Sequence, residues 1–264
     1  MADINESILV EHEGDLCIVT LNRPDRLNAI NAEIQADLTR KLAEADADEA
    51  SKVIVITGAG RGFCAGGDIK GMRGTRVLAS HRPGGVYSGG RRLMNTMLSI
   101  EKPIIAMVNG PAVGLGATIA LLCDAVIMAE DARIGDSHVQ VGLVAGDGGA
   151  VLWPLLIGPS RAKELLLTGR LITGTEAATM GLVSRAVPGD RLREETMALA
   201  AEFAALPPYA ARATKCSVNR FVQWMSNLVL DQSLAYEQIS KATDDHQEAL
   251  AARAEKRKPK FTGS

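Results

Sequence analysis

The sequence predicts an α/β fold whose strands are largely parallel. Short apolar runs alternate with segments in which apolar residues recur at helical spacing. Repeated strands and helices of this length are typical of a parallel sheet covered by helices. The last third of the chain loses the strand signals, so we expect a helical region there. With 264 residues, the chain is long enough to bury one sizeable core.

The first predicted elements are a hairpin, a helix and a buried strand. Residues 8–21 alternate and then become apolar, with a turn at Gly14-Asp15 that indicates a β-hairpin. Apolar residues at helical spacing predict a helix over residues 30–46. The apolar run of residues 53–57 ends in glycines, as a short buried strand does. Together these elements form a strand, helix, strand unit.

The same pattern then recurs along the chain. We expect a helix over residues 91–100, a strand over 104–108, a helix after Gly114 and a strand over 125–128. The intervening residues 71–90 are rich in glycine and include His81, which predicts a long loop. A loop longer than about a dozen residues inside a compact domain is more often functional than not.

The C-terminal part differs in character from the rest. Strand signals vanish from Arg191 onward, and the composition is helical after Pro207-Pro208. We therefore predict a core over residues 1–200 and a helical subdomain over residues 201–264. Its apolar positions exceed what one helix needs, which predicts packing against another subunit. They are Phe221, Trp224, Met225, Leu228, Leu234 and Ile239.

Composition excludes several classes of protein. A net charge of −2 with both signs well mixed argues against nucleic-acid binding. The four cysteines are widely spaced and form no C-x-x-C pair, as expected for reduced thiols in the cytoplasm. The N-terminus lacks a basic start followed by an apolar stretch, so no signal peptide is expected. The longest apolar run, residues 112–129, is interrupted by Asp124 and several glycines, so no membrane span is expected.

Two segments rich in small residues stand out, 61–70 and 109–118, each after an apolar run. Glycine lets main-chain N–H groups approach an oxygen without a side chain in the way. Two such N–H groups can stabilise a developing oxyanion. We therefore expect the two segments, acting together, to hold a carbonyl group.

The sequence lacks the motifs of nucleotide-binding loops, serine hydrolases and zinc sites. The third glycine of a dinucleotide loop is absent, and neither G-x-x-x-x-G-K-[ST] nor G-x-S-x-G occurs. Asp136, Ser137 and His138 are sequence neighbours, so we expect their side chains to point in different directions rather than form a triad. The four histidines are scattered without zinc-ligand spacing, so no metal site is expected.

Several motifs carry a resemblance to a known family. They are Gly66-Gly67-Asp68-Ile69-Lys70, residues 108–116 (VNGPAVGLG), Leu122-Cys123-Asp124, Gly148-Gly149 and the tail 255–259 (EKRKP). In order and spacing they resemble the enoyl-CoA hydratase/isomerase (crotonase) superfamily over nearly the whole chain. The resemblance implies a spiral of ββα repeats with a C-terminal helical trimerisation subdomain, and a homotrimer or dimer of trimers. It also implies an acyl-CoA thioester substrate, with no cofactor beyond the coenzyme A of that substrate.

The resemblance also assigns site residues by position. The oxyanion-hole donors become the main-chain N–H groups of Gly67 and Leu115. Contacts to coenzyme A are implied for Arg23, Arg26, Leu27, Ala65, Asp68, Ile69, and Lys258 or Phe261. Lysine and arginine suit phosphates as a point charge or a planar fork. The alternative for the basic tail is a solvated helix end.

The chain departs from the hydratase pattern at both catalytic glutamates. Thr118 stands where the first glutamate belongs and His138 where the second belongs. A threonine hydroxyl is a poor base, so we group Thr118 with the substrate-binding residues, whereas imidazole can take and give a proton near neutral pH. Asp147, nine residues after His138, would orient the imidazole. The alternatives are a structural histidine and an ordinary turn or helix-capping aspartate.

These residues predict an enzyme that polarises a thioester carbonyl and stabilises an enolate. The first prediction is hydration or isomerisation of an enoyl-CoA, with His138 moving the proton. Residues 138–154 are also similar to the diketone hydrolases of the superfamily, which cleave a carbon–carbon bond by a retro-Claisen reaction with a His/Asp pair. Such a hydrolase, acting on a β-diketone or a β-ketoacyl-CoA, is the first alternative, and a non-catalytic acyl-CoA binder is the second.

Overall fold

A six-stranded sheet forms the centre of the computed structural model, which describes residues 6–68 and 89–264. Its order is β1-β2-β3-β4-β6-β9. The first two strands pair antiparallel, and every other neighbouring pair is parallel. The strands are β1 (Ile8–Glu13), β2 (Leu16–Leu21), β3 (Val53–Gly58), β4 (Ile104–Val108), β6 (Ala125–Ala129) and β9 (Arg185–Val187). The predicted hairpin and the largely parallel α/β sheet are confirmed.

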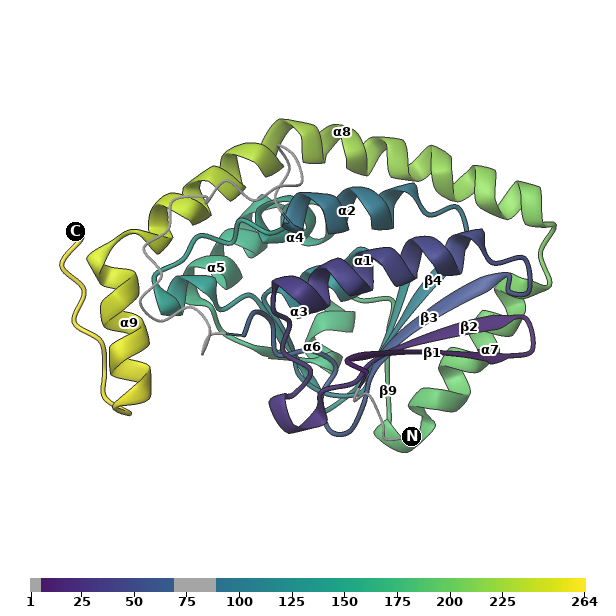
Figure 1. The fold of residues 1–264 in the computed structure, drawn as a ribbon, viewed down its shortest axis with the longest axis horizontal. Coiled ribbons are helices and arrows are strands. Elements are labelled where there is room, and N and C mark those ends of the chain that lie inside the picture. The colour runs from purple at the N-terminus through teal and green to yellow at the C-terminus, as the bar shows by residue number, and fades with distance from the viewer. Residues whose placement is uncertain (1–5, 69–88) are drawn as a thin grey trace.

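Helices cover both faces of this sheet (Figure 1). On one face α1 (Ala32–Ala47) and α2 (Gly89–Ser99) lie side by side, and on the other α7 (Leu192–Ala204) contacts β3, β4 and β6. The first of these helices begins at Ala32 because the side chain of Asn31 accepts a hydrogen bond from the Ile34 N–H, which caps the helix.

A smaller three-stranded sheet stands beside the large one and carries the loops discussed below. It consists of β5 (Ala112–Val113), β7 (Arg133–Gly135) and β8 (Ile172–Thr173). The helices around it are α3 (Leu115–Leu121), α4 (Gly149–Ile157), α5 (Pro159–Thr168) and α6 (Gly174–Thr179). Short 3-10 helices lie in the connecting segments: η1 (Pro24–Arg26), η3 (His138–Val141) and η4 (Gly189–Arg191).

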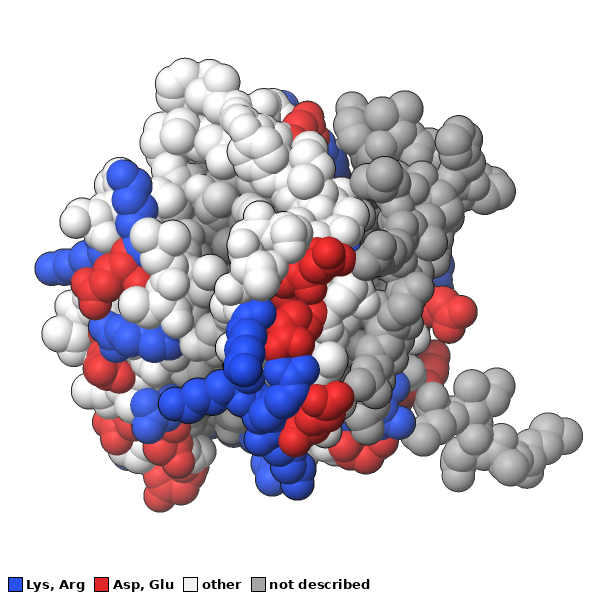
Figure 2. All heavy atoms as spheres, turned by 90° about the vertical axis from the view of Figure 1, so that its left-hand side faces the viewer, with Lys and Arg blue, Asp and Glu red and all other residues white. Residues whose placement is uncertain are grey.

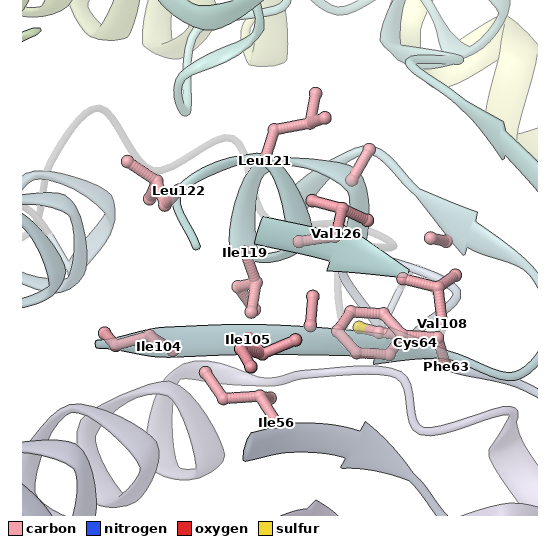
Figure 3. Packing of buried hydrophobic residues seen from close by; sticks show 14 of the residues in the cluster. Ile56, Phe63, Cys64, Ile104, Ile105, Val108, Ile119, Leu121, Leu122 and Val126 are labelled. Carbon is pink, nitrogen blue, oxygen red and sulfur yellow. The ribbon is translucent and has the colours of Figure 1, made fainter. Parts of the chain in front are cut away.

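The core between sheet and helices is aliphatic. Ile104, Ile105 and Val108 of β4 pack with Ile56 of the neighbouring strand and Ile119 of α3 (Figure 3). Each of these five side chains has no exposed area. Burying a side chain of this size stabilises the fold by about 1.5–3 kcal/mol. The packing fixes α3 against β4, and with it the loop that joins them.

Two helices form the C-terminal region, as predicted. The long helix α8 (Pro208–Lys241) runs across α2 and α4, and α9 (Asp244–Ala254) lies at one end of the molecule (Figure 1). Several large apolar side chains of α8 are exposed by more than half: Tyr209, Val218, Phe221, Trp224, Leu228, Tyr236 and Ile239. No helix within residues 6–68 and 89–264 is long and apolar enough to cross a membrane.

Candidate active site

The two glycine-rich segments leave the carboxyl ends of adjacent parallel strands, β3 and β4. They run side by side, because Cys64 and Ala112 form a parallel bridge. The Cys64 N–H donates to the Pro111 carbonyl oxygen, and the Val113 N–H donates to the Cys64 carbonyl oxygen, both at 2.9 Å. Ligands of open α/β sheets bind at the carboxyl ends of the strands, so this is the expected edge for a site.

Gly66 permits the closest approach of the two segments. Its φ is +89°, and a Cβ at this position would lie 2.6 Å from the Val113 carbonyl oxygen and 3.8 Å from the Leu115 nitrogen. Only glycine avoids both the strain and the clash. The chain at residue 66 is thereby held next to the start of α3.

The N–H groups of Gly67 and Leu115 are both available to a ligand. Neither has an acceptor among residues 6–68 and 89–264. Leu115 is the first residue of α3, where N–H groups have no partner within the helix and the helix dipole favours negative charge. Two unpaired donors on adjacent segments are what an oxyanion hole requires.

The loop between β2 and α1, residues 22–31, lies against the first glycine-rich segment. The Ala65 N–H donates to the Leu27 carbonyl oxygen at 2.9 Å, and the Arg23 guanidinium lies 3.5 Å from an Asp68 carboxylate oxygen. Arg26 is more exposed and pairs with its neighbour Asp25. Four of the residues assigned to coenzyme A, Arg23, Leu27, Ala65 and Asp68, therefore gather beside the candidate oxyanion hole.

The remaining assigned residues lie elsewhere. Lys258 and Phe261 belong to the tail that runs back along α9, where the Lys260 N–H donates to Glu248 and the Thr262 N–H to Asp245. Charges of both signs are intermixed on this face (Figure 2). Lys258 lines a polar cavity formed by the tail and α9 rather than by the glycine-rich segments. The predictions for Ile69 and His81, and most of the predicted loop 71–90, lie outside the described residues.

His138 is held by a carboxylate that the sequence analysis missed. An Asp136 carboxylate oxygen lies 2.6 Å from the His138 Nδ1 and also accepts the His138 main-chain N–H at 3.1 Å. The expectation that these neighbours point in different directions is wrong. Asp136 accepts the main-chain N–H two residues further on, as in an Asx turn, and this turn brings the His138 imidazole back to the same carboxylate. The pattern Asp-x-His at the end of a strand was the available signal.

Asp147 lies at the opposite nitrogen of the imidazole. Its carboxylate is 3.7 Å from Nε2, which is close for an ion pair but longer than a hydrogen bond. Thr118 Oγ1 donates to the other carboxylate oxygen of Asp147 at 3.4 Å. The hydrogen bond that holds the imidazole is therefore the one to Asp136, which the prediction did not include, while an orienting role for Asp147 at ion-pair distance stays a prediction. Thr118 contacts Asp147, and Nε2 is the imidazole nitrogen that faces Asp147.

Three carboxylates surround the one imidazole. Burial alone would lower the pKa of His138, but the charges of Asp147 and Asp136 and the hydrogen bond that His138 donates to Asp136 outweigh it and raise that pKa. Burial also raises the pKa of Asp147, and the charges of Asp136 and Glu237 add to this while His138 opposes it. A charged imidazole beside a carboxylate that resists ionisation forms an acid and base pair.

Glu237 is a second residue that the sequence did not single out. It comes from α8, where Lys241 binds one carboxylate oxygen at 2.6 Å. The other oxygen, Oε2, is buried without a hydrogen-bond partner in the described part of the chain. Long-range packing of α8 against the loop at Gly146 places it here, and no local motif reports such packing.

Asp136, His138 and Asp147 also have a geometry compatible with a cation. Each offers one ligand atom, and the three atoms lie within 4.8 Å of one another. The carboxylate of Asp136 accepts the proton on Nδ1, which leaves only Nε2 of the imidazole for a metal. The arrangement fits proton transfer without an ion.

A small cavity joins these parts. Its volume is about 50 Å³. Gly66, Gly67, Gly114 and His138 line one part of it, and His246 and Leu250 of α9 line another. Gly67, one of the two candidate donor residues, and His138 thus line the same space.

Comparison with known proteins finds relatives that match this chain over nearly its full length. The family model "Enoyl-CoA hydratase/isomerase" matches residues 11–264. A probable enoyl-CoA hydratase of Rhizobium meliloti is 37% identical over 97% of this chain and 98% of its own length. A 1,2-epoxyphenylacetyl-CoA isomerase of Escherichia coli is 32% identical over 98% of this chain and 99% of its own.

A solved structure supports the fold as well. The crystal structure of an enoyl-CoA hydratase/isomerase from Mycobacterium paratuberculosis superposes with a TM-score of 0.83 at 37% identity. The match covers 93% of this chain and 97% of that one. The predicted crotonase-like fold with its C-terminal helical region is confirmed, whereas the division at residue 200 and the trimer stay predictions.

Proposed function

We propose, from the premise that this chain belongs to the enoyl-CoA hydratase/isomerase family of the crotonase superfamily, that it binds an acyl-CoA thioester and stabilises its enolate. The observation that carries the proposal is the pair of N–H groups of Gly67 and Leu115, which have no acceptor in the described part of the chain and lie on segments bridged to each other. These donors bind the thioester oxygen. Their hydrogen bonds strengthen as negative charge develops there, so they lower the energy of the transition state more than that of the substrate.

The proton is moved by His138 and Asp147. Asp136 fixes the tautomer with the proton on Nδ1, so Nε2 exchanges protons with the substrate. Asp147, 3.7 Å away, accepts or returns that proton, and Thr118 steadies its carboxylate. In an enoyl-CoA this pair removes or delivers a proton at the carbon chain beside the enolate. Coenzyme A enters only as part of the substrate.

A direct assay tests this function. The purified protein is mixed with crotonyl-CoA, and loss of the conjugated double bond is followed by absorbance. We expect turnover by the parent, and His138→Ala is expected to bind butyryl-CoA like the parent but to lose most of the rate. If the parent neither binds butyryl-CoA nor alters any acyl-CoA thioester, the proposal is wrong.

The carboxylates around His138 favour a second candidate, hydrolysis of a carbon–carbon bond in a β-ketoacyl-CoA or a β-diketone. In this reaction His138 and Asp147 take a proton from water, and the water oxygen bonds to the β-carbonyl carbon. The bond between the α- and β-carbons then breaks, and its electron pair forms an enolate held by Gly67 and Leu115. The enolate is protonated at the α-carbon, and a carboxylic acid leaves.

The same sample separates the two candidates. Acetoacetyl-CoA and a cyclic 1,3-diketone are tested beside crotonyl-CoA, and the products are identified by mass spectrometry. Brisk hydration of crotonyl-CoA without diketone or ketoacyl cleavage removes the hydrolase. The opposite result selects it. A protein that binds all three without turnover is a non-catalytic acyl-CoA binder, as the loss of both glutamates permits.

Self-association through α8 belongs to the same proposal. Phe221, Trp224 and Leu228 are each more than half exposed. Large apolar surfaces of this kind mark interfaces between subunits. A homotrimer or a dimer of trimers would cover them.

A further inference from the structure

His246 closes the candidate cavity from a different helix than the rest of the site. It lies in the first turn of α9 and is 2% exposed. Together with Leu250 it lines the cavity that also contains Gly67, Gly114 and His138. A buried histidine facing the same space as the candidate oxyanion hole is not used by the mechanism above.

The backbone around His246 is built to hold it there. The Thr243 hydroxyl accepts the His246 main-chain N–H at 3.2 Å and so caps α9. Gly142 ends η3 with a φ of +67°, and a Cβ there would lie 2.9 Å from the His246 Cα. Any larger residue at position 142 would push α9 away from η3.

The hydrogen bonding of His246 fixes its tautomer. The Nδ1 atom lies 2.6 Å from the Val141 carbonyl oxygen, and a carbonyl oxygen can only accept. The proton therefore sits on Nδ1, and in the neutral imidazole Nε2 is an acceptor. No partner for Nε2 occurs in residues 6–68 or 89–264. An acceptor without a protein partner, on a residue that lines a cavity, is one that a ligand in that cavity can satisfy.

We propose that His246 Nε2 accepts a hydrogen bond from an N–H or O–H group of the bound acyl-CoA, and so is a ligand-binding residue. The inference rests on the proposed function, because an acyl-CoA must enter this cavity. The donor is an amide N–H of the pantetheine arm or a hydroxyl on the acyl group. Leu250 and Val141 supply the apolar walls on either side.

The experiment compares His246→Asn with the parent and with His12→Asn. Asparagine keeps an N–H donor for the Val141 carbonyl oxygen but removes the acceptor at Nε2. His12 is an exposed histidine on β1 that pairs with Asp48, so its replacement makes the same chemical change away from the cavity. Thermal unfolding of each variant checks the fold. The dissociation constants of butyryl-CoA and 3-hydroxybutyryl-CoA are measured by calorimetry.

We expect His246→Asn to weaken binding about 5- to 10-fold, the worth of about one hydrogen bond, while His12→Asn does not. An equal loss for both thioesters identifies the pantetheine amide as the donor. A loss only for 3-hydroxybutyryl-CoA identifies the acyl hydroxyl. Unchanged binding of both thioesters by a folded His246→Asn overturns the inference and leaves the proposed function intact.

A second measurement, made on the parent protein, tests the inference even if His246→Asn does not fold. In the parent labelled with ¹⁵N-histidine, the Nε2 resonance of His246 should move when butyryl-CoA or 3-hydroxybutyryl-CoA is added, because its lone pair becomes an acceptor. A stationary resonance at saturation with both thioesters overturns the inference. A parent that binds neither thioester removes the proposed function, and this inference with it.

Discussion

Replacing Asp136 by asparagine tests how His138 is held. The Asp136 carboxylate lies 2.6 Å from the His138 Nδ1, and its side chain is 1% exposed. Asparagine keeps the size of the side chain and a carbonyl oxygen for the Nδ1 proton, but it removes the negative charge. The contact that is lost is therefore electrostatic.

The size of the effect follows from this geometry. A hydrogen bond to a charged group is worth about 1.5–3 kcal/mol, and about 1.4 kcal/mol corresponds to tenfold in rate. Asparagine retains a neutral hydrogen bond worth about 1 kcal/mol, so about 0.5–2 kcal/mol is lost and we expect kcat to fall roughly 2- to 30-fold. The charge of Asp136 and its hydrogen bond with His138 both raise the pKa of His138 in the parent. In Asp136→Asn the charge is lost, so the pKa of His138 should fall as well.

The assay is the pH dependence of kcat/KM for whichever acyl-CoA the parent turns over. In Asp136→Asn the limb that reports loss of the His138 proton should move to lower pH, together with the fall in kcat. Asp131→Asn removes an exposed carboxylate from the turn between β6 and β7 and is the matched control. An Asp136→Asn enzyme with the parent's kcat and the parent's pH profile would refute the reasoning.

Three further predictions address other parts of the molecule. Gly66→Ala should lower the midpoint of thermal unfolding and abolish turnover, since its Cβ would lie 2.6 Å from the Val113 carbonyl oxygen; an active, equally stable variant contradicts this. Burial raises the pKa of Asp147 to about 7, so a rate that needs its ionised carboxylate should rise with pH through about 7. Asp147→Asn should lose this rise when the rate is measured across a series of pH values, and a variant that keeps it contradicts the prediction. Under the proposed self-association through α8, where Trp224 is 59% exposed, Trp224→Arg should give smaller species than the parent in sedimentation or light scattering; an unchanged mass would contradict an interface on this face.

Much of the fold could be predicted because its signals are local. The predicted helix over residues 30–46 and the structure's α1 differ by only a few residues, and the strand over 104–108 coincides with β4. Apolar periodicity and caps act within a few residues, so a single sequence reveals them. The two glycine-rich segments were visible for the same reason, although their mutual bridge was not.

The site was predictable only in part, because its contacts join distant residues. His138, Asp147 and Thr118 were identified by position, yet their distances depend on how η3, α3 and the loop before α4 pack. Asp136 was set aside because sequence neighbours were expected to point in different directions, whereas a turn closed by its own carboxylate brings it to His138. Glu237 and His246 come from α8 and α9, whose place over the site is decided by tertiary packing.

The two candidate donors come from segments that follow neighbouring strands of one sheet. Ile54 to Thr57 of β3 pair in register with Ile104 to Met107 of β4, and adjacent strands keep a spacing of about 4.8 Å. The pairing of β3 with β4, continued by the bridge between Cys64 and Ala112, therefore holds the Gly67 and Leu115 segments side by side, and α9 approaches from outside the sheet. Substitutions of His246 or Leu250 on α9 should therefore change the shape of the cavity without moving the two glycine-rich segments.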